Sequence, residues 1–328
     1  MRGSERVRRE WFHVDNGRGW DLALYRTVHP DHYDRSKRAV FVVPGYGMNS
    51  YIFNYHPGDR SIIAALADAG HEVFTVDLRE QGRSSKTKLF KSAAYGLGDL
   101  ALTDLASAMD AAVAHKTSRP REIDLVGASL GGTLSLLYRT QHPKAVEGRV
   151  VLMGSPVRWV QSHPLLGVLF RSPMLAGAVG VRGTRQMAKL ALPTIAKVAP
   201  WALKLYLNPD ATDLGNAAEM IHTVEDPSRH VNREMAHWIR RGDLLVNGRT
   251  LADDVARFDA PLATFFANGD GIVPAQTATF AHGHARSTEK LLVRAGSDSL
   301  PYSHADLFVA RDARQQVFEP LVDFLNKR

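Results

Sequence analysis

The sequence contains no cysteine. Disulfide bonds, a thiolate nucleophile and cysteine-ligated metal sites are therefore excluded. The absence of disulfides fits a reducing compartment, and we expect a cytoplasmic protein. Hydrophobic residues make up 45% and charged residues 23% of the 328 positions, which is ordinary for a globular protein. A chain of this length holds one large domain, or a core domain with a sizeable insertion.

Long uninterrupted hydrophobic runs are also missing. The most apolar stretch, residues 163–181, is broken by Arg171 and Pro173 and is a poor candidate for a membrane span. No apolar segment follows the arginines of the first ten residues, MRGSERVRRE, so we expect no signal peptide. The sequence has no internal repeat and no low-complexity segment that would indicate a repeat fold or a linker.

The net charge of +7 could indicate a nucleic acid or an anionic membrane as partner. The basic residues are, however, scattered along the chain, and their densest group is the N-terminus. We interpret residues 1–9 as a flexible basic N-terminus, with a docking arm as the alternative. We therefore expect a small-molecule partner and no nucleic acid, and the sequence leaves the oligomeric state open.

Hydrophobic patterning predicts strands that alternate with helices. Residues 10–14 and 20–27 read as a hairpin around DNGRG. Beyond them, apolar strand segments alternate with amphipathic helical ones: strands at 39–45, 71–77, 122–127, 149–155, 260–270 and 290–296, and helices at 59–70, 98–116, 130–143, 275–286 and 310–327. This alternation predicts an α/β fold with a mostly parallel central sheet covered by helices on both faces.

The alternation is interrupted between residues 158 and 258. This stretch is mainly helical in pattern, contains repeated prolines and has no convincing strand. We therefore expect an α/β core of residues 10–157 and 259–328, with a mainly helical cap or lid at 158–258. Trp159, Trp201 and Trp238 fall in the cap, where most should hold it together and some could line an apolar acyl pocket.

The stretch DLVGASLGGTLSLLY, residues 124–138, joins a buried strand to an amphipathic helix through Gly-Ala-Ser-Leu-Gly. A serine on so tight a turn has a strained backbone and an exposed hydroxyl, and glycines on either side prevent collisions with the strand and the helix. Between a strand and a helix the pattern is specific, so we predict that Ser129 is a nucleophile.

A serine hydroxyl needs a base, and the base needs an acid to fix its tautomer. Functional residues of a parallel sheet lie beyond the carboxyl ends of its strands. Asp270 follows the strand at 260–270 in the turn ANGDGIVP, and His304 lies in the loop after the strand at 290–296. Their order along the chain, serine then acid then histidine, is the one expected for such a sheet. We predict a Ser129–Asp270–His304 triad.

The oxyanion of the tetrahedral intermediate needs hydrogen-bond donors. The backbone N–H of Leu130 lies at the start of the helix that follows the serine, where the helix dipole assists it. For the second donor we choose the backbone N–H of Tyr46, in the PGYGMNS loop after the strand at 39–45.

A few other residues could take part in the same chemistry or bind a metal. Asp298 and Asp306 lie near His304 in sequence and could replace Asp270, but neither stands at a strand end. His282 and His284 form a His-x-His pattern with no third ligand nearby, which favours a solvated helix end over a metal site. We expect no metal and no organic cofactor.

With these residues in place, the sequence resembles an α/β-hydrolase over residues 20–327. The stretch DLREQGRSS, residues 77–85, resembles the Asp-x-Arg-Gly-x-Gly-x-Ser loop of that superfamily, with Glu80 where the first glycine is usual. Residues 44–77 are similar to the corresponding region of polyhydroxyalkanoate synthases and acid-lipase-like proteins. Residues 241–274 resemble the synthase stretch that leads to its catalytic aspartate.

The synthases use a cysteine nucleophile, whereas this chain has Ser129 at that position. Polymer synthesis depends on a thiolate that accepts and passes on thioester-bound chains, so the serine favours hydrolysis. We predict an esterase- or lipase-like serine hydrolase for a lipophilic or medium-chain acyl ester. An acyltransferase, a synthase-like enzyme or a thioesterase using the same serine is the alternative, followed by a non-catalytic binding protein with this fold.

Overall fold

The computed structural model describes residues 7–327 except 59–60, 88–93, 143–144, 146–147, 164–169, 171–193, 196, 216 and 227. Most of the apolar stretch at 163–181 therefore lies outside the described residues. Within the described part, none of the helices combines the length and the apolar character that crossing a membrane requires.

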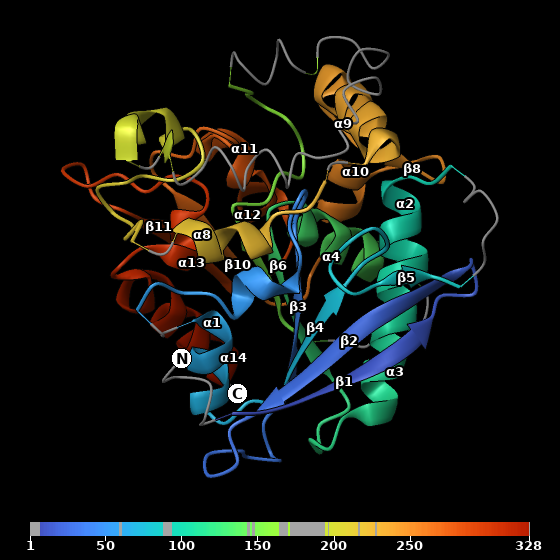
Figure 1. The fold of residues 1–328 in the computed structure, drawn as a ribbon. Coiled ribbons are helices and arrows are strands. Elements are labelled where there is room, and N and C mark those ends of the chain that lie inside the picture. Colours follow the sequence, from blue (N-terminus) through green and yellow to red (C-terminus); the bar gives the residue numbers. More distant parts are fainter. Residues whose placement is uncertain are drawn as a thin grey trace.

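Nine strands of the described chain form one mixed sheet (Figure 1). Along the sheet the order is β1-β2-β4-β3-β6-β7-β10-β11, and β5 pairs with β2. The pairs β1–β2, β2–β4 and β2–β5 are antiparallel, and all others are parallel. The bounds are β1 Arg8–Asp15, β2 Trp20–Val28, β3 Ala39–Val43, β4 Val73–Asp77, β5 Ser85–Lys86, β6 Ile123–Ala128, β7 Val150–Met153, β10 Leu262–Ala267 and β11 Lys290–Ala295.

Helices cover both faces of the sheet because the central strands are apolar on both sides. Strands β3, β4, β6 and β7 are buried at every residue. Helices α2, α3 and α4 pack on one face, and α1 and α14 pack on the other (Figure 1). The bounds are α1 Ile62–Asp68, α2 Leu97–Asp99, α3 Ala106–His115, α4 Leu130–Gln141, α11 Ala275–Ala278, α12 Phe280–His284, α13 Asp306–Val309 and α14 Glu319–Asn326, with π-helical turns at Leu100–Leu105 and Arg314–Phe318.

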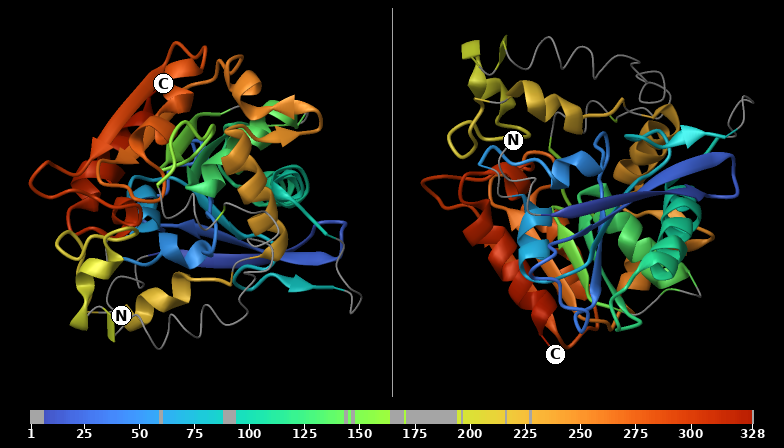
Figure 2. Two further views of the ribbon diagram at one scale, coloured as in Figure 1. Left: turned by 90° about the horizontal axis from the view of Figure 1, so that it is seen from above. Right: turned by 60° about the horizontal axis from the view of Figure 1, so that its bottom comes forward.

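The predicted alternation of strands and helices is confirmed, although several elements are shorter than expected or divided in two, and the first strand begins earlier. Strand β1 begins at Arg8, so Arg8 and Arg9 pair with Val28 and Thr27 of β2. From the sequence, both arginines were expected in a flexible N-terminus of residues 1–9. The sequence gives no strand signal here, because the residues are charged and an exposed edge strand needs no alternation of apolar and polar residues. The hairpin β1–β2 and strand β11 occupy opposite edges of the sheet (Figure 2).

The described parts of residues 158–258 hold short helices and one small hairpin. The helices are η4 Pro200–Leu203, α8 Ala217–Met220, η5 Ile221–Thr223, α9 Arg229–Arg241 and α10 Leu251–Val255. The hairpin consists of β8 Leu245–Val246 and β9 Arg249–Thr250 and was not predicted, because strands of two residues carry no periodicity.

The three tryptophans of residues 158–258 differ in their burial. Trp159 and Trp238 are buried and pack edge to face, with ring centroids 5.8 Å apart, so this pair connects α9 to the loop after β7. Trp201, in contrast, is 71% exposed.

A buried ion pair fixes the loop that follows β4 against the helix layer. The Asp104 carboxylate accepts hydrogen bonds from Arg79 Nε at 2.7 Å and Nη2 at 2.5 Å, and from Asn16 Nδ2 at 2.6 Å. The Arg79 side chain is 6% exposed and that of Asp104 is fully buried. This pair therefore joins the hairpin, the loop after β4 and the helix that contains Asp104.

We expect Asp104→Ala to lower the free energy of unfolding by about 3–5 kcal/mol, because it leaves the Arg79 charge buried without a partner. Urea denaturation measures the change. Asp298→Ala is the matched control, since Asp298 pairs with Arg294 at the surface and its side chain is 91% exposed. Equal urea midpoints of unfolding for the two variants would show that the buried Arg79–Asp104 pair does not stabilise the fold.

Candidate active site

Ser129 lies on the sharp turn between β6 and α4. Its backbone has φ 52° and ψ −122°, a conformation that is rare for residues other than glycine. The turn is held at both ends, because Ser129 N–H donates to Met153 O at 2.8 Å and Gly132 N–H donates to Ser129 O at 3.0 Å. The serine is 9% exposed, and within the described chain its hydroxyl makes no hydrogen bond.

Two glycines around this turn are required by close backbone contacts. A Cβ on Gly127 would lie 2.2 Å from Gly132 Cα, and a Cβ on Gly131 would lie 2.2 Å from Val43 O. Real Cβ atoms do not approach backbone atoms so closely, so neither position accepts a side chain without a backbone shift. The predicted reason for these glycines, contact between strand and helix, agrees with these distances.

The loop after β3 lies directly against the serine. A Cβ on Gly45 would be 2.8 Å from Ala128 O and 2.9 Å from Ser129 Cβ. Next to it, Tyr46 N–H donates to no acceptor among the described residues, and the same holds for Leu130 N–H at the first position of α4. The structure thus brings both predicted oxyanion donors to the turn, each with its backbone N–H available.

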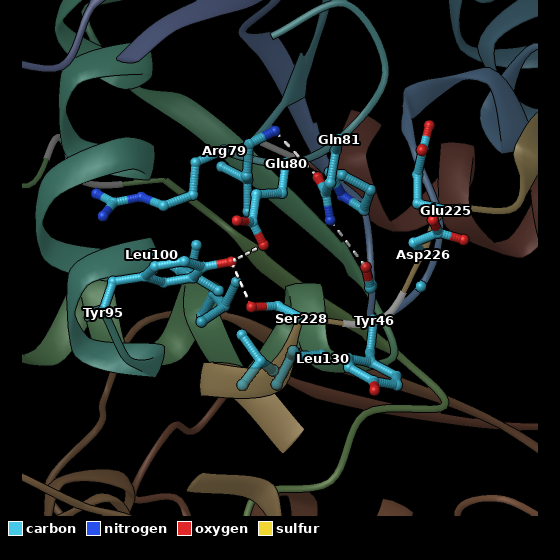
Figure 3. Close-up of a pocket in the computed structure, with 16 residues that line it drawn as sticks. Tyr46, Arg79, Glu80, Gln81, Tyr95, Leu100, Leu130, Glu225, Asp226 and Ser228 are labelled. Atoms are coloured by element: carbon cyan, nitrogen blue, oxygen red, sulfur yellow. Dashed lines mark hydrogen bonds between the residues drawn. The ribbon is translucent and has the colours of Figure 1, made fainter. Parts of the chain in front are cut away.

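Gln81 orients this loop, a role that was not expected from the sequence. Its Nε2 donates to Gly45 O at 3.2 Å, and its Oε1 accepts from Leu78 N–H at 3.0 Å (Figure 3). In a planar trans peptide the C=O and the following N–H point in opposite directions. Gln81 therefore turns the Tyr46 N–H away from itself. The one available signal was its place in the DLREQGRSS loop at the end of β4.

Glu80 occupies a left-handed conformation in the same loop, with φ 62°. This angle explains why glycine is usual there, since glycine reaches it without a steric penalty. In this chain the Glu80 carboxylate accepts a hydrogen bond from Tyr95 OH at 2.6 Å, and Tyr95 OH also contacts Ser228 Oγ at 2.7 Å (Figure 3). The side chain of Glu80 thus connects the loop to the start of α9.

A small cavity of about 30 Å³ lies beside Tyr46 and Leu130, the two predicted oxyanion donors. Its wall includes Tyr46, Leu130 and Glu80, as Figure 3 shows. The Tyr46 hydroxyl donates to Asn232 Oδ1 of α9, and burial raises the pKa of this phenol. A cavity of this size holds about one or two waters, so the described residues here do not enclose an acyl chain.

Asp270 and His304 form a buried pair. His304 Nδ1 lies 2.6 Å from Asp270 Oδ2, and the two side chains are 4% and 1% exposed. The other carboxylate oxygen, Asp270 Oδ1, accepts hydrogen bonds from the backbone N–H groups of Ile272 and Val273, both at 2.8 Å. With Nδ1 donating to the carboxylate, the Nε2 atom of the imidazole is left to accept a proton.

The end of β7 connects this pair to the serine turn. Met153 O accepts from Ser129 N–H, and the next residue, Gly154, lies against the His304 ring, since a Cβ on Gly154 would be 3.1 Å from His304 Cε1. Within the described chain Ser129 Oγ and His304 are not hydrogen-bonded. Such bonds are often long in the absence of substrate. The structure thus pairs Asp270 with His304, and the end of β7 at Met153 and Gly154 lies between this pair and Ser129.

The two alternative acids do not face the histidine. Asp298 is exposed and pairs with Arg294. Asp306 is fully buried, but its carboxylate accepts hydrogen bonds from Ser303 N–H, Asn208 N–H and Thr212 Oγ1. Burial raises the pKa of Asp306 to about 6. Asp270 is thus the acid that contacts His304, as the sequence predicted.

Histidines elsewhere offer no convincing metal site among the described residues. His284 Nδ1 bonds Phe280 O at 2.8 Å, and no third ligand joins it and His282. A separate group, His29, His32 and Asp68, has ligand atoms within 4.8 Å of one another. The Asp31 N–H, however, donates to His29 Nδ1, so the neutral ring carries its proton on the Nε2 atom that faces Asp68. With a proton on that atom, His29 is not ready to bind a metal ion.

Comparison with known proteins agrees with the resemblance seen in the sequence. A family model described as alpha/beta hydrolase fold matches residues 38–302. The chain is 22% identical over 334 residues to "Poly(3-hydroxyalkanoate) polymerase subunit PhaC" of Thiocystis violacea, covering 94% of this chain and 86% of that protein. It is 25% identical over 296 residues to an uncharacterized protein of Mycobacterium tuberculosis, covering 85% and 76%.

Solved structures with the same fold include an esterase from Exiguobacterium antarcticum, with a TM-score of 0.62 and 17% identity over 97% of this chain and 100% of that one. A hydrolase from Pseudomonas aeruginosa has a TM-score of 0.61 and 16% identity, covering 97% and 99%. At identities this low, the likeness establishes the fold.

We expect Gly131→Ala to destabilise the protein by about 1–3 kcal/mol or more, because the new methyl group meets the backbone of Val43. Thermal unfolding with a matched control measures the effect. Gly283→Ala in α12 is that control, since a Cβ there meets nothing within 4 Å. A Gly131 variant as stable as the Gly283 variant would contradict the tight contact at the turn.

Proposed function

The chain belongs to the alpha/beta hydrolase fold family, and on this premise we propose that it is a serine hydrolase that cleaves a carboxylic ester through an acyl-enzyme on Ser129. The observation that carries the proposal is the buried Asp270–His304 pair, joined at 2.6 Å, at the same edge of the sheet as the strained turn of Ser129. A buried histidine with its Nδ1 held by a carboxylate is suited to act as a general base.

The proposed reaction follows from these positions. His304 Nε2 takes the proton of Ser129 Oγ as the oxygen attacks the acyl carbon, and the resulting imidazolium gives it to the leaving alcohol. Asp270 orients the ring and stabilises its positive charge. Water then attacks the acyl-enzyme with His304 again as base, which releases the acid and restores the serine.

In the tetrahedral intermediates the oxyanion would accept hydrogen bonds from the backbone N–H groups of Leu130 and Tyr46. Both are without another acceptor in the described chain, and Leu130 begins a helix of 12 residues whose dipole favours a negative charge. Gln81 fixes the peptide of Tyr46 before the charge develops, so the donors do not need to reorganise during the reaction.

For the substrate we propose a lipophilic or medium-chain acyl ester. Support comes from the esterases among the structural neighbours and from the apolar stretch 163–181 within residues 158–258, which we propose act as a cap. The reaction as proposed needs no metal and no organic cofactor.

We expect Ser129→Ala to reduce kcat for p-nitrophenyl esters by at least about 10⁴-fold, because the acyl-enzyme can no longer form. A panel of esters graded by acyl length measures activity and identifies the preferred chain. The matched control is Ser135→Ala on the same helix, whose hydroxyl donates to Gly131 O away from the reacting groups, and it should stay within about threefold of the unaltered protein. Undiminished turnover by Ser129→Ala would refute the proposal.

A second candidate, acyl transfer, is favoured by the relatives named as poly(3-hydroxyalkanoate) polymerase subunits. Transfer and hydrolysis share the acyl-enzyme and differ in whether water or another nucleophile attacks it. The serine favours hydrolysis, because those relatives' chemistry, as the sequence resemblance implies, passes chains through a thiolate.

We therefore expect a hydroxyacyl-thioester to yield free hydroxy acid and no chain product. Mass spectrometry of the products decides between the two reactions, with Ser129→Ala as the background control. Oligomers of the hydroxyacyl unit, absent from the control, would favour transfer over hydrolysis.

A further inference from the structure

The loop that carries His304 is crossed by residues 203–212 from the proposed cap. Ser303 Oγ donates to Lys204 O at 2.6 Å, and Ala305 N–H donates to Tyr206 O at 2.8 Å. Both sequence neighbours of His304 are thus hydrogen-bonded to the crossing segment. The backbone on either side of the histidine is therefore fixed by residues about a hundred positions away in sequence.

Asp306 is the junction between the loop and the crossing segment. Its Oδ2 accepts Ser303 N–H at 2.7 Å and Asn208 N–H at 2.8 Å, and its Oδ1 accepts the Thr212 hydroxyl at 2.7 Å. The residue is fully buried. The Asp306 carboxylate therefore connects Ser303, the residue before His304, to Asn208 and Thr212 of the crossing segment.

The His304 ring has little freedom to shift. On one side, a Cβ on Gly154 would come within 3.1 Å of the ring, so the backbone there lies close to it. Nearby, the Tyr206 ring lies with its centroid 6.1 Å from that of His304. Tyr206 O also accepts the hydrogen bond from Ala305 N–H. The crossing segment therefore holds the backbone of the histidine loop and also supplies the aromatic ring next to the His304 imidazole.

We propose that Asp306 is a positioning residue for His304, holding the histidine loop to residues 203–212 so that the imidazole keeps its place between Asp270 and Ser129. The inference rests on the proposed function, in which His304 is the base. Asp306 acts through the backbone and does not touch the reacting atoms. A displacement of about 1 Å in a catalytic group can lower the rate on the order of 100-fold.

Asp306→Ala and Asp306→Asn separate position from charge. Alanine removes all three hydrogen bonds. Asparagine has the same shape, so its Oδ1 can accept the two backbone N–H groups while its Nδ2 donates to the Thr212 hydroxyl. At pH 8, where Asp306 is ionised, we expect Asp306→Ala to lower kcat roughly 100-fold with KM changed by less than about threefold, and Asp306→Asn to retain kcat within about fivefold.

Proton NMR supplies a readout that general destabilisation does not reproduce. The proton shared by His304 Nδ1 and Asp270 should resonate far downfield in the unaltered protein and in Asp306→Asn, and should be lost or shifted in Asp306→Ala. Asp270→Asn is the control that removes this signal. If Asp306→Ala does not fold, Thr212→Val removes one of the three ties, and it should lower kcat about 3–10-fold and shift the same resonance.

Three outcomes would overturn the inference. Equal losses for Asp306→Asn and Asp306→Ala would mean that the charge, and not the position, matters. An unchanged kcat and resonance in Asp306→Ala, or in Thr212→Val where the alanine variant is unfolded, would mean that the loop needs no such tie. The proposed function is tested separately, because Ser129→Ala must be inactive before any of these comparisons is read.

Discussion

The site depends on a backbone contact that only glycine permits. At the end of β6 the chain turns so sharply into α4 that Gly127 and Gly132 touch, and Gly131 lies against Val43 of the neighbouring strand. This contact drives Ser129 into its left-handed conformation and brings the loop of Gly45 against the serine. Strain of this kind costs of order 1–3 kcal/mol and persists because the buried sheet on both sides leaves no alternative path.

From this turn the site extends in two directions, and residues of the proposed cap hold each half. Toward Tyr46, Glu225 N–H donates to Gly47 O at 2.8 Å, and Met48 pairs with Val224 in an isolated bridge. Toward His304, residues 203–212 bind the histidine loop through Asp306. Residues 203–212 and 224–225 of the proposed cap are thus structural partners of both loops.

The sequence predicted the core of this arrangement because its signals are local. A glycine-flanked serine between a strand and a helix, and an aspartate directly after a strand, can be recognised from neighbouring residues, and the order of the elements then implies that they meet. Asp306 was seen in the sequence, but its role was not, since its partners Asn208 and Thr212 lie about a hundred residues away. Roles that consist of hydrogen bonds to distant backbone leave no pattern in a single sequence. The same holds for the two-residue strands β8 and β9.

Glu80 shows how such a hidden role can be inferred once the backbone is known. From sequence, a glutamate in place of the usual glycine has no catalytic meaning. Its φ of 62° is unfavourable for a side chain, yet the conformation is needed because the next residue, Gln81, must reach Gly45 O. The hydrogen bond from Tyr95 to the Glu80 carboxylate offsets part of this strain and ties the loop to α9. The orientation of the Tyr46 peptide therefore rests on a strained residue that, within the described chain, is hydrogen-bonded to none of the proposed catalytic groups.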